Sequence, residues 1–263
     1  MTDGISHIAV DGFEVWCLED GTHVFDAATF PGCAWDEQQT RLEAAGLTGI
    51  RTVFNVYLIR DPAGGLTLVD TGCGDRKGYA GGALPQRLAA LDVAPAAIDR
   101  LVFTHLHSDH VGGTLVDGAL AYPNARVVMH PAEAAHWTGT DQGAGQVLAH
   151  LGDGWTAAED GAEIVPGLTL WHLPGHTPGH AGLRIGSRLV LVGDIIHSEA
   201  LQLGDPRLCT RYDVDPALAT DMRLAALRTV ADGGLIWSGS HMLGPSKFAR
   251  LAEIGDGFIR VPL

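Results

Sequence analysis

Residues 104–110 read THLHSDH and directly follow the apolar run RLVF. The apolar run predicts a short buried strand that ends where the polar residues begin. Residues two apart on an extended chain point the same way, so His105 and His107 can face one metal ion. Asp109 and His110 begin the next turn and can face a second ion. Neutral imidazoles with carboxylates suit zinc, and also iron, manganese or cobalt.

Composition and charge limit the classes of protein to which this chain can belong. Hydrophobic residues make up 46% and charged residues 18% of its 263 positions, as is typical of a globular protein with a substantial core. The formal net charge of −14 repels phosphate backbones and anionic lipid headgroups. We therefore expect a small-molecule substrate, with no nucleic acid and no membrane surface as partner. The oligomeric state stays open between a monomer and a homodimer.

The cysteines and the N-terminal segment bear on the cellular compartment. Cysteines stand at positions 17, 33, 73 and 209 and form no CxxC pair, so we expect free thiols and no zinc ribbon or disulfide scaffold. The start MTDGISHIAVDGFEVW lacks the basic region and apolar core of a signal peptide, and no apolar run is long enough to cross a bilayer. A cytoplasmic location is therefore expected.

Short apolar stretches alternate with helical candidates along the chain. Stretches such as VFNVYLI, ARVVMH and LTLWHL have the length and composition of strands. The pairs VYLIRDPAGGLTLVD and GLRIGSRLVLV are typical of hairpins, so part of the sheet is antiparallel. Helices are predicted over 78–91, 131–137, 144–151 and 213–232. The class is therefore α/β, and because no linker divides the chain we expect one domain over residues 1–263.

Five candidate metal ligands or supporting residues stand where predicted strands end. They are Asp70 after LTLV, His105 after RLVFT, His176 after LTLWHLPG, Asp194 after RLVLVG and His241 after LIWSGS. In α/β folds, binding sites gather at the carboxyl ends of strands. The pattern therefore predicts one convergent site.

Five motifs occur in the order known from one enzyme family. They are LVDTG at 68–72, THLHSDHVGG at 104–113, LPGHTPGH at 173–180, VGD at 192–194 and SGSH at 238–241. Together they resemble the metallo-β-lactamase superfamily, and they span most of the chain. The resemblance implies an αββα sandwich of two mixed sheets flanked by helices, with a metal site in the cleft between the sheets.

The resemblance also implies a ligand set for two divalent metal ions, with zinc the first expectation. One ion would be bound by three histidines, the other by a mixed set, and a carboxylate would bridge them: His105, His107 and His176; Asp109, His110 and His241; and Asp194. Asp70 would support a ligand from behind by hydrogen bonding.

The chain lacks features that are typical of several branches of the superfamily, so its resemblance to those branches is weaker. Zinc β-lactamases with two metals carry cysteine where Asp194 stands, and glyoxalase II thioesterases carry a C-terminal helical region for which we expect no room after His241. Persulfide dioxygenases use one iron, whereas both sets of ligands are present here. Nucleic-acid-processing members carry large extra domains.

The remaining likeness is to acyl-homoserine lactonases and methyl-parathion-hydrolase-like proteins. FNVYLI, GDIIHSEALQLGDP, YDVDPALA and the final GFIRVPL are similar to stretches of that group. Acyl-homoserine lactonases often carry Tyr three residues after the bridging Asp, where this chain has His197, which is more similar to the organophosphate hydrolases. We expect His197 to hydrogen-bond the substrate.

The predicted reaction is the opening of a lactone or ester, with an N-acyl-homoserine lactone as lead substrate. Hydroxide bridging the metals would attack the carbonyl, and Asp109 would pass a proton to the leaving alkoxide. Phosphotriester hydrolysis, thioester hydrolysis of the glyoxalase II type and a mono-iron oxygenase stay open as alternatives. Candidate substrate-pocket residues are Phe30, Trp35 and Trp137, the last in a loop-like insertion at 132–143.

Overall fold

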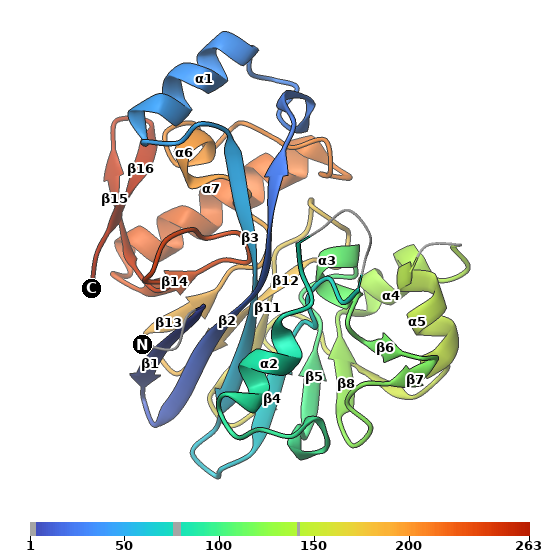
Figure 1. Ribbon diagram of the computed structural model, residues 1–263. Coiled ribbons are helices and arrows are strands. Elements are labelled where there is room, and N and C mark those ends of the chain that lie inside the picture. The colour runs from blue at the N-terminus through green and yellow to red at the C-terminus, as the bar shows by residue number, and fades with distance from the viewer. Residues whose placement is uncertain (1–3, 76–79, 141–142) are drawn as a thin grey trace.

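The computed structural model of the protein describes residues 4–75, 80–140 and 143–263, and two main β-sheets pack face to face in it (Figure 1). Among these residues the first sheet has seven strands in the order β1-β2-β3-β4-β5-β8-β9. Pairing is antiparallel from β1 to β4 and parallel from β4 to β9. The strands are Ile5–Val10, Phe13–Phe25, Ile50–Arg60, Leu66–Val69, Arg100–Val102, Arg126–Met129 and Trp155–Ala157.

The second sheet, within the same described residues, has five strands in the order β10-β11-β12-β13-β14. Its first three pairs are antiparallel, and β13 pairs with β14 in parallel. The strands are Glu163–Val165, Leu168–His172, Ala181–Ile185, Leu189–Leu191 and Ile236–Ser238. Two short hairpins complete the described strands: β6 (Leu115–Val116) with β7 (Ala119–Leu120), and β15 (Arg250–Ile254) with β16 (Gly257–Val261).

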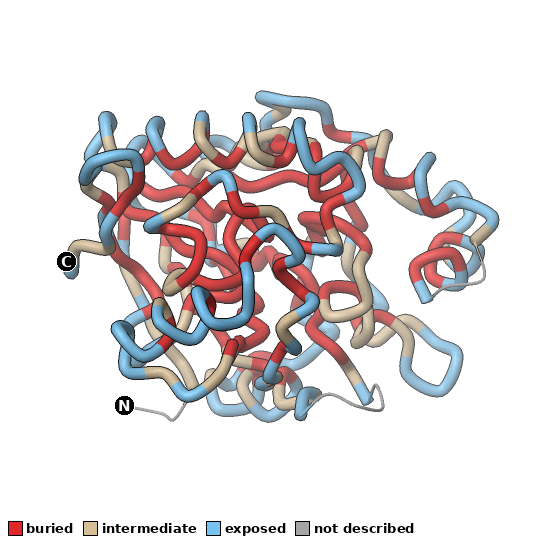
Figure 2. Tube along the Cα trace, turned by 90° about the horizontal axis from the view of Figure 1, so that it is seen from above, coloured by how far each residue is buried: buried red, intermediate tan, exposed pale blue. Residues whose placement is uncertain are grey.

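The central core lies between the two sheets. Val15 and Tyr57 of the first sheet pack in one cluster with Leu170, Leu183 and Leu191 of the second, and all five side chains are buried. Strand β3 is buried at nearly every position, because a strand covered on both faces needs apolar residues on both. Figure 2 shows this buried interior enclosed by exposed turns and helix faces.

Helices cover the outer face of each sheet. Helices α2 (Leu84–Ala89), α4 (Pro131–Trp137) and α5 (Gly143–Leu151) pack on the first sheet, and α7 (Pro216–Asp232) packs on the second. The short helices α3 (Ser108–Val111) and α6 (Glu199–Gln202) follow β5 and β13. The order helix, sheet, sheet, helix is the predicted αββα sandwich, which is confirmed.

Three predicted helices lie close to their expected positions. Helices α4 and α5 match 131–137 and 144–151, whereas α7 begins at Pro216 and not at 213. The carboxylate of Asp215 accepts a hydrogen bond from the Leu218 amide, so Asp215 caps the helix and residues 213–214 lie outside it. The helix predicted over 78–91 forms only at 84–89, and positions 78–79 fall outside the described residues.

The segment 26–49 is more ordered than the sequence suggested. It forms the 3₁₀ turn Ala27–Thr29 and helix α1 (Trp35–Ala44), and a second 3₁₀ turn lies at Pro95–Ala97. No helix in the described part of the chain is long and apolar enough to span a membrane.

Candidate metal centre

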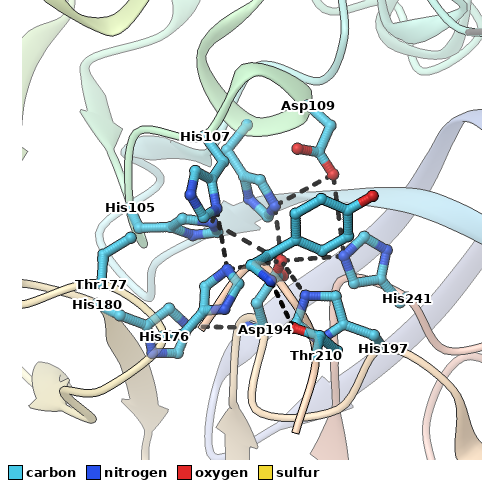
Figure 3. Close-up of polar contacts among 12 residues, drawn as sticks. His105, His107, Asp109, His176, Thr177, His180, Asp194, His197, Thr210 and His241 are labelled. Atoms are coloured by element: carbon cyan, nitrogen blue, oxygen red, sulfur yellow. Dashed lines mark hydrogen bonds and ion pairs between the residues drawn. The ribbon is translucent and has the colours of Figure 1, made fainter. Parts of the chain in front are cut away.

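Five strand ends from both sheets deliver polar side chains to one place. Asp70 and His105 follow β4 and β5 of the first sheet, and His176, Asp194 and His241 follow β11, β13 and β14 of the second. The convergence predicted from the sequence is therefore present: His105, His176, Asp194 and His241 point toward one another (Figure 3), and Asp70 lies behind His110.

Three imidazoles form what we call the three-histidine group: His105, His107 and His176. His107 Nδ1 lies 3.0 Å from His105 Nε2 and 2.9 Å from His176 Nε2. His105 and His176 are buried, and His107 is half-buried. Burial and the neighbouring imidazoles hold the pKa values of His105 and His107 well below the usual range, so both rings are neutral and offer lone pairs.

The mixed group consists of Asp109, His110, Asp194 and His241. Its four ligand atoms lie within 4.8 Å of one another. Asp194 Oδ1 is 3.3 Å from His110 Nε2, and Asp194 Oδ2 is 3.0 Å from His241 Nε2. Asp194 Oδ2 is also 3.7 Å from His105 Nε2 and 3.5 Å from His176 Nε2, so this carboxylate stands between the two groups (Figure 3).

The chemistry of these atoms fits two bound cations. Within the described residues, the buried atoms His110 Nε2 and Asp194 Oδ1 have no hydrogen-bond partner, which is costly unless an ion satisfies them. Although burial opposes it, the carboxylates of Asp194 and Asp109 raise the pKa of His110 well above its usual value. The same negative potential favours a divalent cation at Nε2.

The outer nitrogen of each of three histidines is fixed by a hydrogen bond, which points Nε2 into the centre. His110 Nδ1 lies 2.8 Å from Asp70 Oδ2, and His241 Nδ1 lies 3.0 Å from the carbonyl oxygen of Val53. His176 Nδ1 lies 2.8 Å from Asp213 Oδ1. Such partners set the tautomer and orientation of metal-binding imidazoles. Asp70 thus lies where the sequence predicted it, whereas Asp213 was not foreseen.

Asp70 adopts a conformation that is uncommon for a residue other than glycine. Its φ is 64°, and its buried carboxylate accepts hydrogen bonds from the Thr104 amide at 2.8 Å and the Thr104 hydroxyl at 2.7 Å. These bonds fasten the end of β4 to the start of the His105 loop. The strained backbone therefore places the carboxylate behind His110.

Glu133 of α4 fastens the two loops that carry the three-histidine group. Its buried carboxylate accepts hydrogen bonds from Leu106 N at 2.8 Å and Trp137 Nε1 at 2.7 Å through Oε1. Through Oε2 it accepts from Thr177 Oγ1 at 2.5 Å and Gly179 N at 3.1 Å. One carboxylate therefore links the loop after β5 to the loop after β11. Nothing in the local sequence marks Glu133 for this role, because a glutamate within a helix is usually a solvated side chain.

His197 lies at the edge of the centre, as expected. Its Nε2 is 3.4 Å from Asp194 Oδ2, and its ring stacks on His241 with centroids 4.9 Å apart. Burial lowers the pKa of His197 to about 4, so the ring is neutral at neutral pH. Its Nδ1 is buried and has no hydrogen-bond partner among the described residues.

Two aromatic residues that the sequence did not suggest lie beside the centre. Phe25 and Tyr212 lie 6.5 Å and 6.2 Å from the His197 ring, and Phe25 lies 6.1 Å from His241. Phe25 ends β2 and Tyr212 stands in the loop before α7, far apart in sequence. No local pattern could have paired them.

The three predicted pocket residues have different surroundings. Phe30 is fully buried in a core cluster with Leu42 and Leu208, which accounts for its apolar ring by packing. Trp35 begins α1 and is 46% exposed. Trp137 is buried, 5.5 Å from the His107 ring, and it belongs to helix α4, so the expected loop insertion at 132–143 is wrong through residue 137. Positions 141–142 lie outside the described residues.

Comparison with known proteins places this centre in a family. The profile of the metallo-beta-lactamase superfamily matches residues 51–233, and the chain belongs to that superfamily. It is 34% identical over 177 residues to a hydroxyacylglutathione hydrolase of Aeromonas hydrophila subsp. hydrophila, covering 64% of this chain and 57% of that protein. It is 35% identical over 86 residues to an N-acyl homoserine lactonase of a Bacillus species, covering 32% of each. The chain thus spans less than two thirds of the length of either relative.

Among solved structures, the chain is similar to AidC, a dizinc quorum-quenching lactonase in complex with a product N-hexanoyl-L-homoserine. The TM-score is 0.91 at 23% identity, and the match covers 99% of this chain and 97% of that chain. At this identity the likeness shows the fold.

Proposed function

We propose that this chain is a metal-dependent hydrolase with two divalent metal ions, zinc first, and that it opens a lactone or ester. The observation that carries the proposal is the carboxylate of Asp194, which stands between the three-histidine group and the mixed group. His105, His107 and His176 would hold one ion and Asp109, His110 and His241 the other, with Asp194 shared. Such a pair lowers the pKa of water toward neutrality and polarises a carbonyl oxygen.

The exposure of the ligands indicates where a substrate enters. Asp109 is 16% exposed at its side chain and His107 is half-buried, whereas the other five proposed ligands are buried. Phe25 and Tyr212 flank the His197 side of the centre. An apolar wall with a few convergent polar atoms favours a substrate that carries a hydrophobic group next to its reacting carbonyl.

The chain's own residues have distinct tasks in this proposal. Asp109 Oδ2, which lies 3.8 Å from His241 Nε2 and has solvent access, would take the proton that the attacking hydroxide carries into the adduct and pass it to the leaving alkoxide. His197 Nδ1 hydrogen-bonds the substrate and positions its carbonyl. Asp109 Oδ2 lies beside the mixed group, and the His197 ring lies at the edge of the centre with its Nδ1 unpartnered among the described residues.

An N-acyl-homoserine lactone is the lead substrate. Support comes from the lactonase relative and from AidC, whose fold matches nearly the whole chain. The hydrolysed bond and the hydrophobic acyl chain also suit the polar centre and its aromatic flank.

Two other hydrolytic activities are candidates for this chain, each supported by one observation. The hydroxyacylglutathione hydrolase relative supports a thioesterase. A neutral, buried His197 beside the centre supports a phosphotriesterase, because it can donate a hydrogen bond to a phosphoryl oxygen without adding charge. A mono-iron oxygenase is a further candidate that metal analysis separates, since it requires one iron per chain.

The test is a turnover panel with the zinc-loaded protein. It contains N-acyl-homoserine lactones of several chain lengths, a simple lactone, an aryl ester, a phosphotriester and a glutathione thioester. We expect the fastest turnover with a lactone or ester. Fast thioester turnover without lactone or ester turnover contradicts the lead. Asp194→Asn, with an unchanged circular dichroism spectrum, should abolish turnover of every substrate.

A further inference from the structure

A buried ion pair lies directly behind His176. The carboxylate of Asp213 faces His176 Nδ1 at 2.8 Å through Oδ1, and Arg223 Nη2 donates to Asp213 Oδ2 at 3.2 Å. The amide of Thr210 donates to the same Oδ2 at 2.9 Å. The side chains of Asp213 and Arg223 are 0% and 1% exposed. Neither residue is one of the proposed metal ligands.

Arg223 connects this carboxylate to the loop that carries Asp194. Its Nε donates to the carbonyl oxygen of Ile195, the residue after Asp194, at 2.5 Å. Its Nη1 donates to the carbonyl oxygen of Pro206 at 3.1 Å. One guanidinium on α7 therefore spans from the Asp194 loop to the partner of His176.

The backbone holds the Asp213 segment against the His176 loop. The Val214 amide donates to the carbonyl oxygen of His176 at 3.0 Å, and the Asp215 amide donates to that of Gly175 at 2.9 Å. Gly175 has φ 127°, and a Cβ there would lie 2.3 Å from the Ala219 amide nitrogen of α7. Only glycine lets the loop approach the helix this closely.

We propose that Asp213 and Arg223 are positioning residues that fix His176 and set the metal affinity of the three-histidine group. The inference rests on the proposed two-metal function. The Asp213 carboxylate accepts the Nδ1 proton of His176, which leaves the Nε2 lone pair toward His107 and Asp194. A carboxylate behind an imidazole also makes that imidazole a stronger ligand.

Arg223 compensates the buried negative charge of Asp213. A buried carboxylate is costly unless a cation compensates it, and the guanidinium does so while donating to three acceptors. Among the described residues, His176 is the one member of its group whose ring nitrogen meets a carboxylate from outside the centre; His105 Nδ1 has only the Thr104 hydroxyl at 3.2 Å. The loss of Asp213 should therefore weaken one metal site and spare the other.

The test is a titration of metal-free protein with Co²⁺ against a competing chelator, followed through the visible absorption of bound Co²⁺. We compare the wild type with Asp213→Asn, Arg223→Lys and the matched control Asp215→Asn, whose exposed carboxylate caps α7 through the Leu218 amide. The wild type should bind two ions. Asp213→Asn should lower the affinity for one of these ions about 10–100-fold and alter the visible spectrum of that bound ion. Asp215→Asn should leave the affinity for both ions unchanged.

Arg223→Lys should lower the affinity for the same ion by a smaller factor, because lysine keeps the positive charge but lacks the forked donors of arginine. This variant serves as the test if Asp213→Asn does not fold. The inference is overturned if Asp213→Asn and Arg223→Lys both bind the two ions with wild-type affinity and only their unfolding temperature falls. The ion pair would then stabilise the fold without affecting metal binding. A wild type that binds fewer than two ions overturns the proposed function instead, and the inference with it.

Discussion

Substitution of Glu133 by Gln tests how the loops of the three-histidine group are held. The carboxylate serves four buried donors at 2.5–3.1 Å, two on each oxygen. An amide oxygen can serve one pair, but the amide nitrogen must then face the other pair. If it faces Thr177 and Gly179, the hydroxyl can turn to accept, whereas the Gly179 amide is left without an acceptor.

The expected cost follows from that orphaned donor. One buried amide without a partner, together with weaker bonds at the remaining donors, costs about 2–3 kcal/mol. For a chain of this size the unfolding temperature should fall by about 4–12 °C. The assay is thermal unfolding of metal-stripped protein, because bound metal would add its own stabilisation.

The matched control is Glu163→Gln. The Glu163 carboxylate accepts one bond, from the Gly167 amide at 3.0 Å, in an exposed position. Its replacement should change the free energy of unfolding by no more than about 0.5 kcal/mol. Equal shifts for the two variants would refute the reasoning, because the four bonds to Glu133 would then carry no more stability than one exposed bond.

Further predictions concern the metals, the aromatic flank and one buried histidine. Prolonged dialysis against a strong chelator should abolish turnover and lower the unfolding temperature, and zinc should restore both; turnover that survives at zero metal content contradicts the site. Phe25→Ala should raise KM for long-chain acyl lactones several-fold more than for a short-chain lactone, and a uniform change in both would argue against an acyl contact. His180, whose Nδ1 donates to the carbonyl oxygen of Leu173 and whose Nε2 accepts from the Asp194 amide, has its pKa lowered by burial from 6.5 to about 3. Its contribution to stability is thus complete above pH 6.5 and is lost as the pH falls toward 3. NMR titration should find this ring neutral at pH 5, and protonation near pH 6.5 would contradict its buried placement.

The clustering of the candidate ligands could be predicted because their pattern is local. His105, His107, Asp109 and His110 fall within six positions directly after a strand, and the folded chain brings them to one place. Hairpins were equally visible: β3 with β4 and β12 with β13 are close in sequence, and both pair as predicted. The αββα layering followed from the resemblance carried by the five motifs, not from periodicity.

Supporting residues were hidden because their contacts join distant segments. Asp213 reaches His176 from 37 positions away, and Glu133 reaches Thr177 from 44. An Asp before a helix or a Glu inside one has ordinary local explanations as a cap or a solvated side chain. Phe30 and Phe25 show the same limit: both pack into one buried cluster, yet of the two it is Phe25 whose ring also lies beside His197 and His241.

The central claim is that two metal ions share the Asp194 carboxylate, and anomalous X-ray diffraction from zinc-loaded crystals tests it most directly. We expect two zinc peaks, one against His105, His107 and His176 and the other against Asp109, His110 and His241, with Asp194 between them. A single fully occupied peak, or two peaks of which neither contacts Asp194, would contradict it.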